Sequence, residues 1–246
     1  YKEMAEGDGH LKTGSVRRLI VGEPIGVFYG YRFDGIFQNE EECKQQTSSA
    51  SPIGVGLRRY KDLNGDGVID DYDKCLIGQG DVPKIYYGFG ADLQLGDFSV
   101  GALFAGNAKA DRCLGGNAMY PFNDGSGITN LFANITDRWS ADNPTNQDVF
   151  YPRLHHGNNA NQNNMKTSTW WQKDVSFLRL KQLTIAYQLP KKLINQTFLK
   201  SARIYVMGTN LLTFSKFKLW DPELNTNNGT AYPNVRTYSV GVNVSF

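Results

Sequence analysis

The twelve residues from Asp62 to Asp73 carry the clearest pattern for metal chemistry in this sequence. Oxygen-bearing side chains recur there at alternate positions, and twelve-residue calcium loops place their ligands with this spacing around a central glycine, here Gly67. The predicted ligands are side-chain oxygens and, at Val68, a main-chain carbonyl; in order they are Asp62, Asn64, Asp66, Val68, Asp70 and Asp73. The spacing therefore predicts one structural Ca²⁺.

Two interpretations of this loop remain open. The carboxylates within it repel one another unless a cation lies between them, which favours a bound ion. Asp73 stands where such loops usually have a bidentate glutamate, and its shorter side chain makes it the weakest of the predicted ligands. The alternative is a loop of Asx turns without a metal.

Other residues offer little catalytic chemistry. His155 and His156 are adjacent and have no acidic or cysteine partner at ligand spacing, so surface or lumen contact is the better interpretation. The sequence has no Ser-His-Asp order, no G-x-S-x-G elbow, no P-loop and no H-E-x-x-H motif. We therefore predict that the protein is not an enzyme.

Aromatic side chains in polar, asparagine-rich stretches are candidates for substrate or partner contact. Indole and phenol rings stack on sugar rings or peptide side chains, and asparagine both donates and accepts hydrogen bonds. The alternatives are packing of the loops on themselves or an aromatic girdle at a membrane interface. The candidates are Trp139, Tyr151, Trp170, Trp171 and Trp220.

Composition excludes several classes of protein. The chain has 246 residues and a net charge of +2, which argues against a strongly basic nucleic-acid binder or a polybasic membrane-surface protein. No apolar run reaches the roughly 18 residues of a transmembrane helix, but barrel strands would escape this criterion. Cys43, Cys75 and Cys113 form no CxxC pair, which argues against a zinc site and a disulfide framework. The start at Tyr1 and the lack of a signal peptide favour a fragment of a longer protein.

Predicted strands from about residue 84 onward must hold the loops that carry these residues. Residues 1–83 have an irregular texture, and two-residue alternation begins at about 84. Strands are predicted at about 84–95, 98–106, 176–189, 201–212 and 235–246, with long loops at 107–175 and 213–234. Gly96-Asp97 predicts a tight turn, and a slip of parity near Lys181-Gln182 predicts a bulge. Residues 190–200 form a short connection with about one helical turn.

The last predicted strand has two unlike faces. Val240, Val242 and Val244 share one face with aromatic residues, whereas Asn243 and Ser245 lie on the other. A soluble all-β domain would bury the apolar face in its core. A transmembrane barrel would turn the apolar face to lipid and the polar face to a wet lumen. The residues alone leave both architectures open.

An ordered series of motifs resembles the C-terminal part of a SusC/RagA-type TonB-dependent outer-membrane transporter. No single motif decides this, but the series spans nearly the whole chain in order. The motifs are 22–31 (GEPIGVFYGY), 34–38 (DGIFQ), 62–70 (DLNGDGVID), 77–78 (IG), 138–139 (RW), 143–144 (NP), 151–154 (YPRL), 176–181 (SFLRLK), 187–191 (YQLPK), 202–206 (ARIYV), 210–214 (NLLTF) and the terminal Phe246.

The resemblance implies an all-β fold: a large transmembrane antiparallel barrel of about 22 strands with long extracellular loops. It also implies import of oligomeric nutrients, glycan or peptide, across the outer membrane of a Gram-negative bacterium. The implied partners are the N-terminal part of the same protein (plug and other strands), the TonB complex acting through that part, and a SusD-like surface lipoprotein as lid. With the last strand ending at the periplasmic side, segments 1–83, 107–175 and 213–234 are expected to be extracellular.

The alternative prediction is a soluble, secreted β-rich module that binds glycans. This module would have the calcium loop but would not lie in a membrane. The two predictions differ in where the apolar side chains of the strands lie, because a soluble module must bury them and a barrel must expose them.

Overall fold

The computed structural model describes residues 10–13, 17–20, 22–24, 26–49, 51–116, 119–122, 131–155, 158–195 and 197–246. The chain divides into two compact units. The loop unit comprises residues 1–82, 111–174 and 226–230, and the sheet unit comprises residues 83–110, 175–225 and 231–246.

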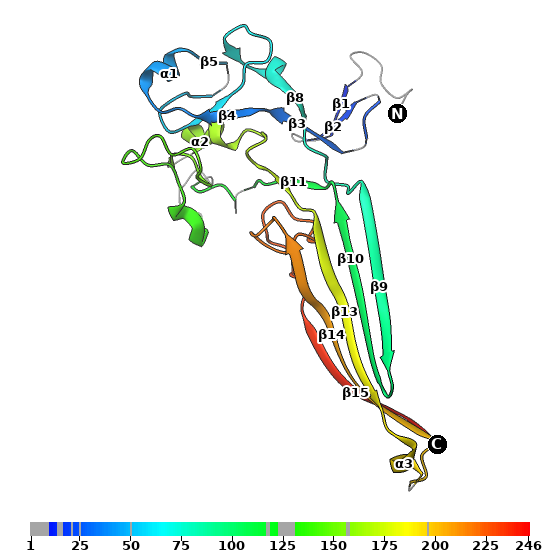
Figure 1. Cartoon of the computed structure of the whole chain (residues 1–246). Coiled ribbons are helices and arrows are strands. Elements are labelled where there is room, and N and C mark those ends of the chain that lie inside the picture. The colour runs from blue at the N-terminus through cyan, green and yellow to red at the C-terminus, as the bar shows by residue number, and fades with distance from the viewer. Residues whose placement is uncertain are drawn as a thin grey trace. The chain divides into compact units, whose positions relative to one another are not determined.

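The sheet unit is one antiparallel sheet of five long strands (Figure 1). Its spatial order is β15-β14-β13-β10-β9. The bounds are β9 (Ile85–Leu95), β10 (Phe98–Ala108), β13 (Phe177–Gln188), β14 (Ser201–Ser215) and β15 (Thr237–Ser245). These strands correspond to the predicted ones, except that β14 runs further, to Ser215, and β15 begins later, at Thr237. This sheet bears out the predicted all-β class.

Register places apolar side chains on one face of all five strands. Leu93 pairs with Val100, Val100 with Ile185, Ile185 with Val206, and Val206 with Val240. Directly opposed residues point to the same face of a sheet, so these five form a row across it. Large exposed side chains with this parity are Ile85, Tyr87, Phe89, Leu93, Leu95, Phe98, Val100, Ile185, Ile204, Val206, Leu212, Phe214, Tyr238, Val240, Val242 and Val244.

The opposite face is mostly small and polar. The neighbouring row runs from Asp92 through Gly101, Thr184 and Met207 to Ser239. We call the two surfaces the apolar face and the polar face. A sheet that exposes its apolar side chains has no core to bury them in, which favours lipid over water as the environment of that face.

The short connections of the sheet agree with the sequence. Leu95 pairs with Phe98 across a turn at Gly96-Asp97, as predicted. Leu103 of β10 pairs with Gln182 and Phe104 pairs with Leu180, so Lys181 is the extra residue of a bulge against β10, and the predicted bulge is confirmed. Helix α3 (Lys191–Ile194) is the predicted helical turn. Both connections lie at the end of the sheet where β15 finishes (Figure 1).

The loop unit is built from short elements. They are β1 (His10–Thr13), β2 (Arg17–Ile20), β3 (Val27–Tyr31), β4 (Phe33–Ile36), α1 (Glu40–Lys44), β5 (Thr47–Ser48), β6 (Arg58–Tyr60), β7 (Val68–Ile69), the 3₁₀ turn Asp71–Asp73, β8 (Lys74–Ile77), β11 (Asp111–Cys113), the 3₁₀ turn Ala133–Thr136, α2 (Asn158–Met165) and β12 (Gln172–Asp174). Strands β1-β2-β3-β8 form one sheet, and β4-β6, β5-β7 and β11-β12 pair separately.

The irregular texture predicted for residues 1–83 is therefore wrong where the structure describes them. Strands of two to five residues are too short to show alternation in the sequence. Their partners are also distant along the chain, as when Gly30 of β3 pairs with Cys75 of β8. Ile25, within the first motif of the series, lies outside the described residues.

Among the helices that the structure describes, none has the length and apolar character needed to cross a membrane.

Candidate functional site

The loop from Asp62 to Asp73 follows β6 and folds around its own main chain. The carboxylate of Asp62 accepts hydrogen bonds from the amides of Gly65 at 2.6 Å and Gly67 at 2.7 Å. Gly67 has φ +80°, a left-handed conformation that suits glycine. The two amides, Gly67 first, lower the pKa of Asp62 below its usual value, so this carboxylate is ionised at neutral pH.

The other predicted oxygen ligands also face the loop's main chain. Asp73 is fully buried and accepts from the amides of Leu63 at 2.7 Å and Asp70 at 2.9 Å. Asp66 accepts from the amide of Val68 at 2.8 Å, and Asp70 accepts from the amide of Tyr72 at 2.8 Å.

The donor chemistry of the loop fits a hard cation. A carboxylate oxygen has two lone pairs, so a hydrogen bond to an amide leaves the second one for an ion. In the part of the chain that the structure describes, however, no three His, Cys, Asp or Glu side chains converge closely enough to form a metal cluster. The Ca²⁺ prediction therefore stays a prediction, with Asn64 and the Val68 carbonyl needed to complete the ligand set.

The five candidate aromatic residues differ in exposure. Trp139, Tyr151 and Trp171 are buried in the loop unit, where they cannot touch a ligand outside it. Trp170, in the same unit, and Trp220, in the sheet unit, are partly exposed. Sequence composition could not separate these cases, because an indole ring serves a core as well as a contact surface.

Arg58 of β6 lies at the centre of the buried aromatic residues. Its guanidinium carbon is 4.1 Å from the ring centre of Trp171 and 4.7 Å from that of Trp170. The side chain is fully buried, and its Nη1 donates to the carbonyl of Asn164 in α2. Nε and Nη2 have no hydrogen-bond partner among the described residues. Burial lowers the pKa of Arg58 to about 9, and the pKa of the neighbouring Tyr60 is raised by burial to about 12.

Further hydrogen bonds fix β6 to α2. The side-chain amide of Asn163 donates to the Arg58 carbonyl at 2.6 Å, and the Tyr60 hydroxyl donates to the Asn163 carbonyl at 2.5 Å. These contacts join residues more than 100 positions apart in the sequence. Nothing in the sequence marks this centre, since two adjacent arginines before a polar loop look like surface residues.

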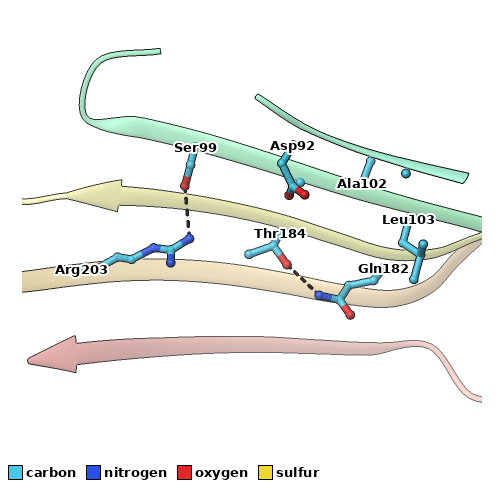
Figure 2. A pocket seen from close by; sticks show the side chains of 9 residues that line it. Asp92, Ser99, Ala102, Leu103, Gln182, Thr184 and Arg203 are labelled. Carbon is cyan, nitrogen blue, oxygen red and sulfur yellow. Dashed lines mark hydrogen bonds between the residues drawn. The ribbon is translucent and has the colours of Figure 1, made fainter. Parts of the chain in front are cut away.

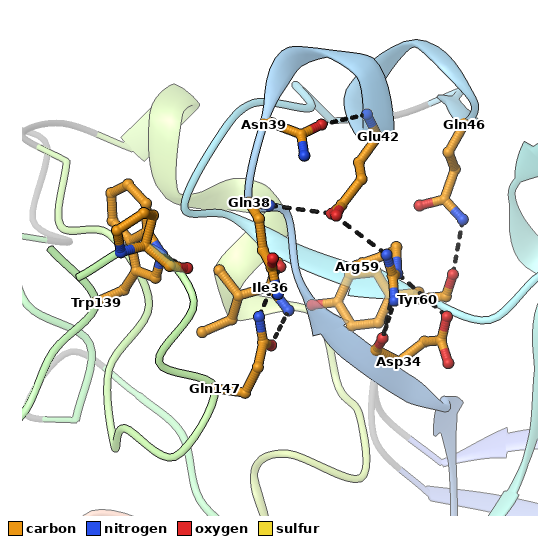
Figure 3. Close-up of polar contacts among 11 residues, drawn as sticks. Asp34, Ile36, Gln38, Asn39, Glu42, Gln46, Arg59, Tyr60, Trp139 and Gln147 are labelled. Atoms are coloured by element: carbon orange, nitrogen blue, oxygen red, sulfur yellow. Dashed lines mark hydrogen bonds and ion pairs between the residues drawn. The ribbon is translucent and has the colours of Figure 1, made fainter. Parts of the chain in front are cut away.

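A second polar group ties β4 to the segments around it (Figure 3). The guanidinium of Arg59 contacts the carboxylates of Asp34 at 3.2 Å and Glu42 at 3.4 Å. The side-chain amide of Gln147 accepts from the Ile36 amide at 2.7 Å and donates to the Ile36 carbonyl at 3.1 Å. The side chain of Gln147 thus takes the position of a neighbouring strand, and it satisfies the main-chain hydrogen-bonding groups of Ile36 at the unpaired edge of β4.

The polar face of the sheet unit has a hollow of about 410 Å³. Figure 2 shows Asp92 and Arg203 among the side chains that line it, with the Arg203 guanidinium donating to the Ser99 hydroxyl at 3.2 Å. Gly101 leaves room for the Asp92 carboxylate, because a Cβ at that position would lie 2.3 Å from an Asp92 oxygen. Polar side chains such as Asp92, Thr184 and Arg203 share the lining of this hollow with Ala102 and Leu103.

A buried cation in the sheet unit holds the segment after β14. Arg179 of β13 is 1% exposed and forms ion pairs with Asp221 and, at 3.3 Å, with Glu223. Lys181 also contacts Glu223, at 2.7 Å. We call these four residues the Arg179 cluster. Burial would raise the pKa of Asp221, but the hydrogen bonds from Arg179 and the Glu223 amide hold it below its usual value.

Sequence comparison finds relatives along almost the entire chain. TonB-dependent receptor P3 of Formosa agariphila is 31% identical over 253 residues, which cover 97% of this chain and 24% of the receptor. TonB-dependent receptor P26 of the same organism is 33% identical over 258 residues, with the same coverage. The chain thus spans about a quarter of the length of these relatives. No protein-family profile matches it.

Solved structures with a similar fold agree with the sequence relatives. The RagAB peptide importer in its 'open-open' state matches with a TM-score of 0.69 and 25% identity, over 99% of this chain and 24% of that chain. Its 'closed-closed' state matches with a TM-score of 0.73 and 24% identity, over 99% of this chain and 25% of that chain.

The fold and these relatives define a segment of a large β-barrel receptor. The chain is similar to a segment of TonB-dependent receptors, and the resemblance to the SusC/RagA type is confirmed. Its relatives are receptors, which also confirms the prediction that it is not an enzyme.

The charge of Arg58 is testable by substitution. Arg58→Met should leave the thermal stability of the transporter unchanged or raise it by up to about 2 kcal/mol, because a buried cation without an acidic partner carries an uncompensated desolvation cost. The Asn164 carbonyl keeps its bond from the Trp171 indole at 2.8 Å. Arg58→Ala should instead cost about 2–4 kcal/mol through the cavity it leaves. Equal losses for Met and Ala, measured by thermal unfolding, would contradict this account.

The pH dependence of the same residue provides a second measurement. Its pKa falls from 12.5 to about 9 on folding, so the unfolded chain binds more protons between these values. Stability contributed by this site should therefore rise with pH across that interval. The stability of wild type relative to Arg58→Met should therefore increase as the pH passes above 9. A difference that stays constant would show that Arg58 keeps its ordinary pKa.

The Arg179 cluster should hold the segment after β14 against proteolysis. Lys216 and Lys218 are exposed in that segment and are trypsin sites. Arg179→Met leaves two carboxylates without their buried cation and should destabilise the segment by roughly 3 kcal/mol, so cleavage at these lysines accelerates. Lys181→Met should have a smaller effect, since its ion pair is more exposed. Arg203→Met, on the same face, serves as the control.

The cluster should also weaken in acid. The native pKa of Asp221 is lowered, so its stabilising contribution is complete above the usual aspartate pKa of about 3.9 and is lost as the pH falls through the lowered value. Proteolysis with an acid-active protease should show release of the segment only in that low range. Release near neutral pH would contradict the assignment.

Proposed function

We propose that the chain is part of a TonB-dependent active transporter that imports oligomeric nutrients across the bacterial outer membrane. The apolar face, which is continuous over all five strands, is the observation that carries this proposal. On that face, a row of exposed apolar side chains runs across the strands from Leu93 to Val240 and suits contact with hydrocarbon. The opposite, polar face suits an aqueous lumen. The kinship with TonB-dependent receptors supports the same function.

On this proposal, the other parts of the transporter belong to the remainder of the protein. Strands β9 and β15 each have one ladder partner among the described residues, so both free edges need further strands if the sheet lies in lipid. The plug and the contact with the TonB complex would belong to the N-terminal part. The cargo is a glycan or a peptide; likeness to a protein described as a peptide importer favours peptide.

The rival function, a soluble calcium-containing glycan-binding module, has less support. Val240 is 75% exposed and Val242 is 60% exposed, with comparable exposure across the other strands. A soluble module would have to cover a surface of this size.

An arginine scan across β15 tests the membrane assignment. Val242→Arg should destabilise the inserted barrel by roughly 2–4 kcal/mol if this position lies near mid-bilayer, whereas Asn243→Arg should cost much less, because the two side chains point to opposite faces. The measurement is unfolding of the transporter in lipid vesicles. Equal effects at the two neighbouring positions would contradict a lipid-facing Val242.

The proposed lid is a SusD-like surface lipoprotein that contacts the extracellular segments. Tyr72, in the loop 62–73, is 81% exposed and is a natural reporter of that contact. A photo-cross-linking residue at Tyr72 should capture a second polypeptide in the intact transporter extracted with mild detergent. The same group at Leu193, in the predicted periplasmic connection, should capture none. A transporter that never carries a second polypeptide would overturn the lid.

The proposed structural Ca²⁺ has its own test. Calcium should raise the melting temperature of the transporter and slow proteolysis of the loop, with an affinity on the order of 10⁻⁴ M, sufficient outside the cell. Asp62→Asn and Asp66→Asn should abolish both effects. Asp71→Asn is the matched control, because Asp71 is in the same loop, is not a predicted ligand, and pairs with Lys74.

An experimental structure decides the site directly. Oxygen ligands at 2.3–2.6 Å around one density are expected from the six predicted residues. An ordered loop without an ion, in the presence of calcium, would reduce the motif to a set of Asx turns.

A further inference from the structure

The end of the sheet unit that carries both short connections has exposed apolar side chains beyond the strands. Phe198 is 82% exposed and stacks on Phe246, with ring centres 5.6 Å apart and planes inclined by 7°. Leu193 of α3 is also exposed. Figure 1 shows α3 beside the end of β15. Phe246 has the parity of Val244 and Val242, so these residues extend the apolar face past the last ladder pair.

Three cations accompany this apolar group. Lys191, Lys192 and Lys200 are all exposed, and none forms an ion pair within the part of the chain that the structure describes. Lys200 is fixed by its main chain, whose amide donates to the Ser245 carbonyl at 2.7 Å. Asp97, in the turn between β9 and β10, is the only acidic residue in 95–98, 187–195, 197–202 and 244–246. The local charge is therefore positive.

The side-chain types at this end match a lipid boundary. Lysine places its alkyl stem along apolar surface and its ammonium in the polar region beyond it. Exposed rings in the same place suit the junction of headgroups and acyl chains. Neither a free phosphate nor an acidic protein would make use of the exposed Leu193, Phe198 and Phe246, whereas a phospholipid supplies a phosphate and acyl chains together.

We propose that Lys191, Lys192 and Lys200, with Leu193, Phe198 and Phe246, form a binding surface for anionic phospholipid headgroups. The proposal rests on the proposed membrane function, since it needs the apolar face to lie in lipid. Each lysine near an anionic surface should favour it by roughly fivefold. The attraction between the lysines and the headgroups would then help to fix how deep this end of the barrel lies in the membrane, together with the apolar side chains.

The test uses the full-length transporter in nanodiscs of equal phosphatidylglycerol and phosphatidylcholine. After transfer to mild detergent, the lipids that remain bound are measured by native mass spectrometry. Wild type should retain phosphatidylglycerol in preference. The triple variant Lys191→Gln, Lys192→Gln and Lys200→Gln should lose that preference at least fivefold. The control removes three exposed lysines at the other end of the same sheet, Lys84→Gln, Lys109→Gln and Lys216→Gln, and should keep it.

The outcomes are distinct. An unchanged preference in the first triple variant, or an equal loss in the control, overturns the surface. Phe198→Ala should lower retention of both lipids alike, and a loss confined to phosphatidylglycerol would contradict its apolar role. If the proposed membrane function itself is wrong, the wild-type protein will not enter nanodiscs at all.

Discussion

Main-chain hydrogen bonding along the ladder from β9 to β15 is the constraint on which the sheet unit depends. Long strands whose amides and carbonyls pair with neighbours leave no polar main chain on either face, which is the condition for a surface to lie in hydrocarbon. Once the ladder is formed, the two-residue period of a strand decides on which face of the sheet each side chain lies. Val206 and Val240 fall on one side and Met207 and Ser239 on the other, and a shift by one residue would exchange them. The bulge at Lys181 breaks that period in β13, and β14 has its own extra residue opposite it, where Asn210 and Leu211 face Lys181.

The loop unit is held by different means. Its strands are too short to supply a ladder of comparable strength, and α2 has no acidic residue in its first turn and no basic residue in its last. Long-range side-chain contacts take the place of regular structure. The Arg58 guanidinium between two indoles, and the bonds from Asn163 to Arg58 and from Tyr60 to Asn163, connect β6 with a helix far along the chain. Gln147 plays a similar role for β4, where it completes a strand edge with one amide.

Charge is used in three ways in this chain. In the loop 62–73, carboxylates accept hydrogen bonds from main-chain amides, and the same loop has the oxygen atoms that would ligate a cation. In the Arg179 cluster, a buried arginine is compensated by two carboxylates, so it restrains a segment. Arg58 has no acidic partner among the described residues, and its stacking on aromatic rings offsets only part of the cost of burial. The three arrangements explain why burial lowers the pKa of Arg58, whereas hydrogen bonds lower that of Asp62 and Asp221.

The sequence determined the features that repeat locally. Alternation over ten or more residues predicted the five long strands, the turn at Gly96-Asp97 and the slip at Lys181, because side-chain direction in a strand depends on parity alone. The spacing from Asp62 to Asp73 likewise predicted a loop with inward oxygens. Only the tertiary structure decided that Trp139, Tyr151 and Trp171 are core residues, that 1–83 contains short paired strands, and that Arg58 and Arg179 are buried. Each of these depends on contacts between segments distant along the chain, and local pattern holds no information about which distant segment will supply the partner.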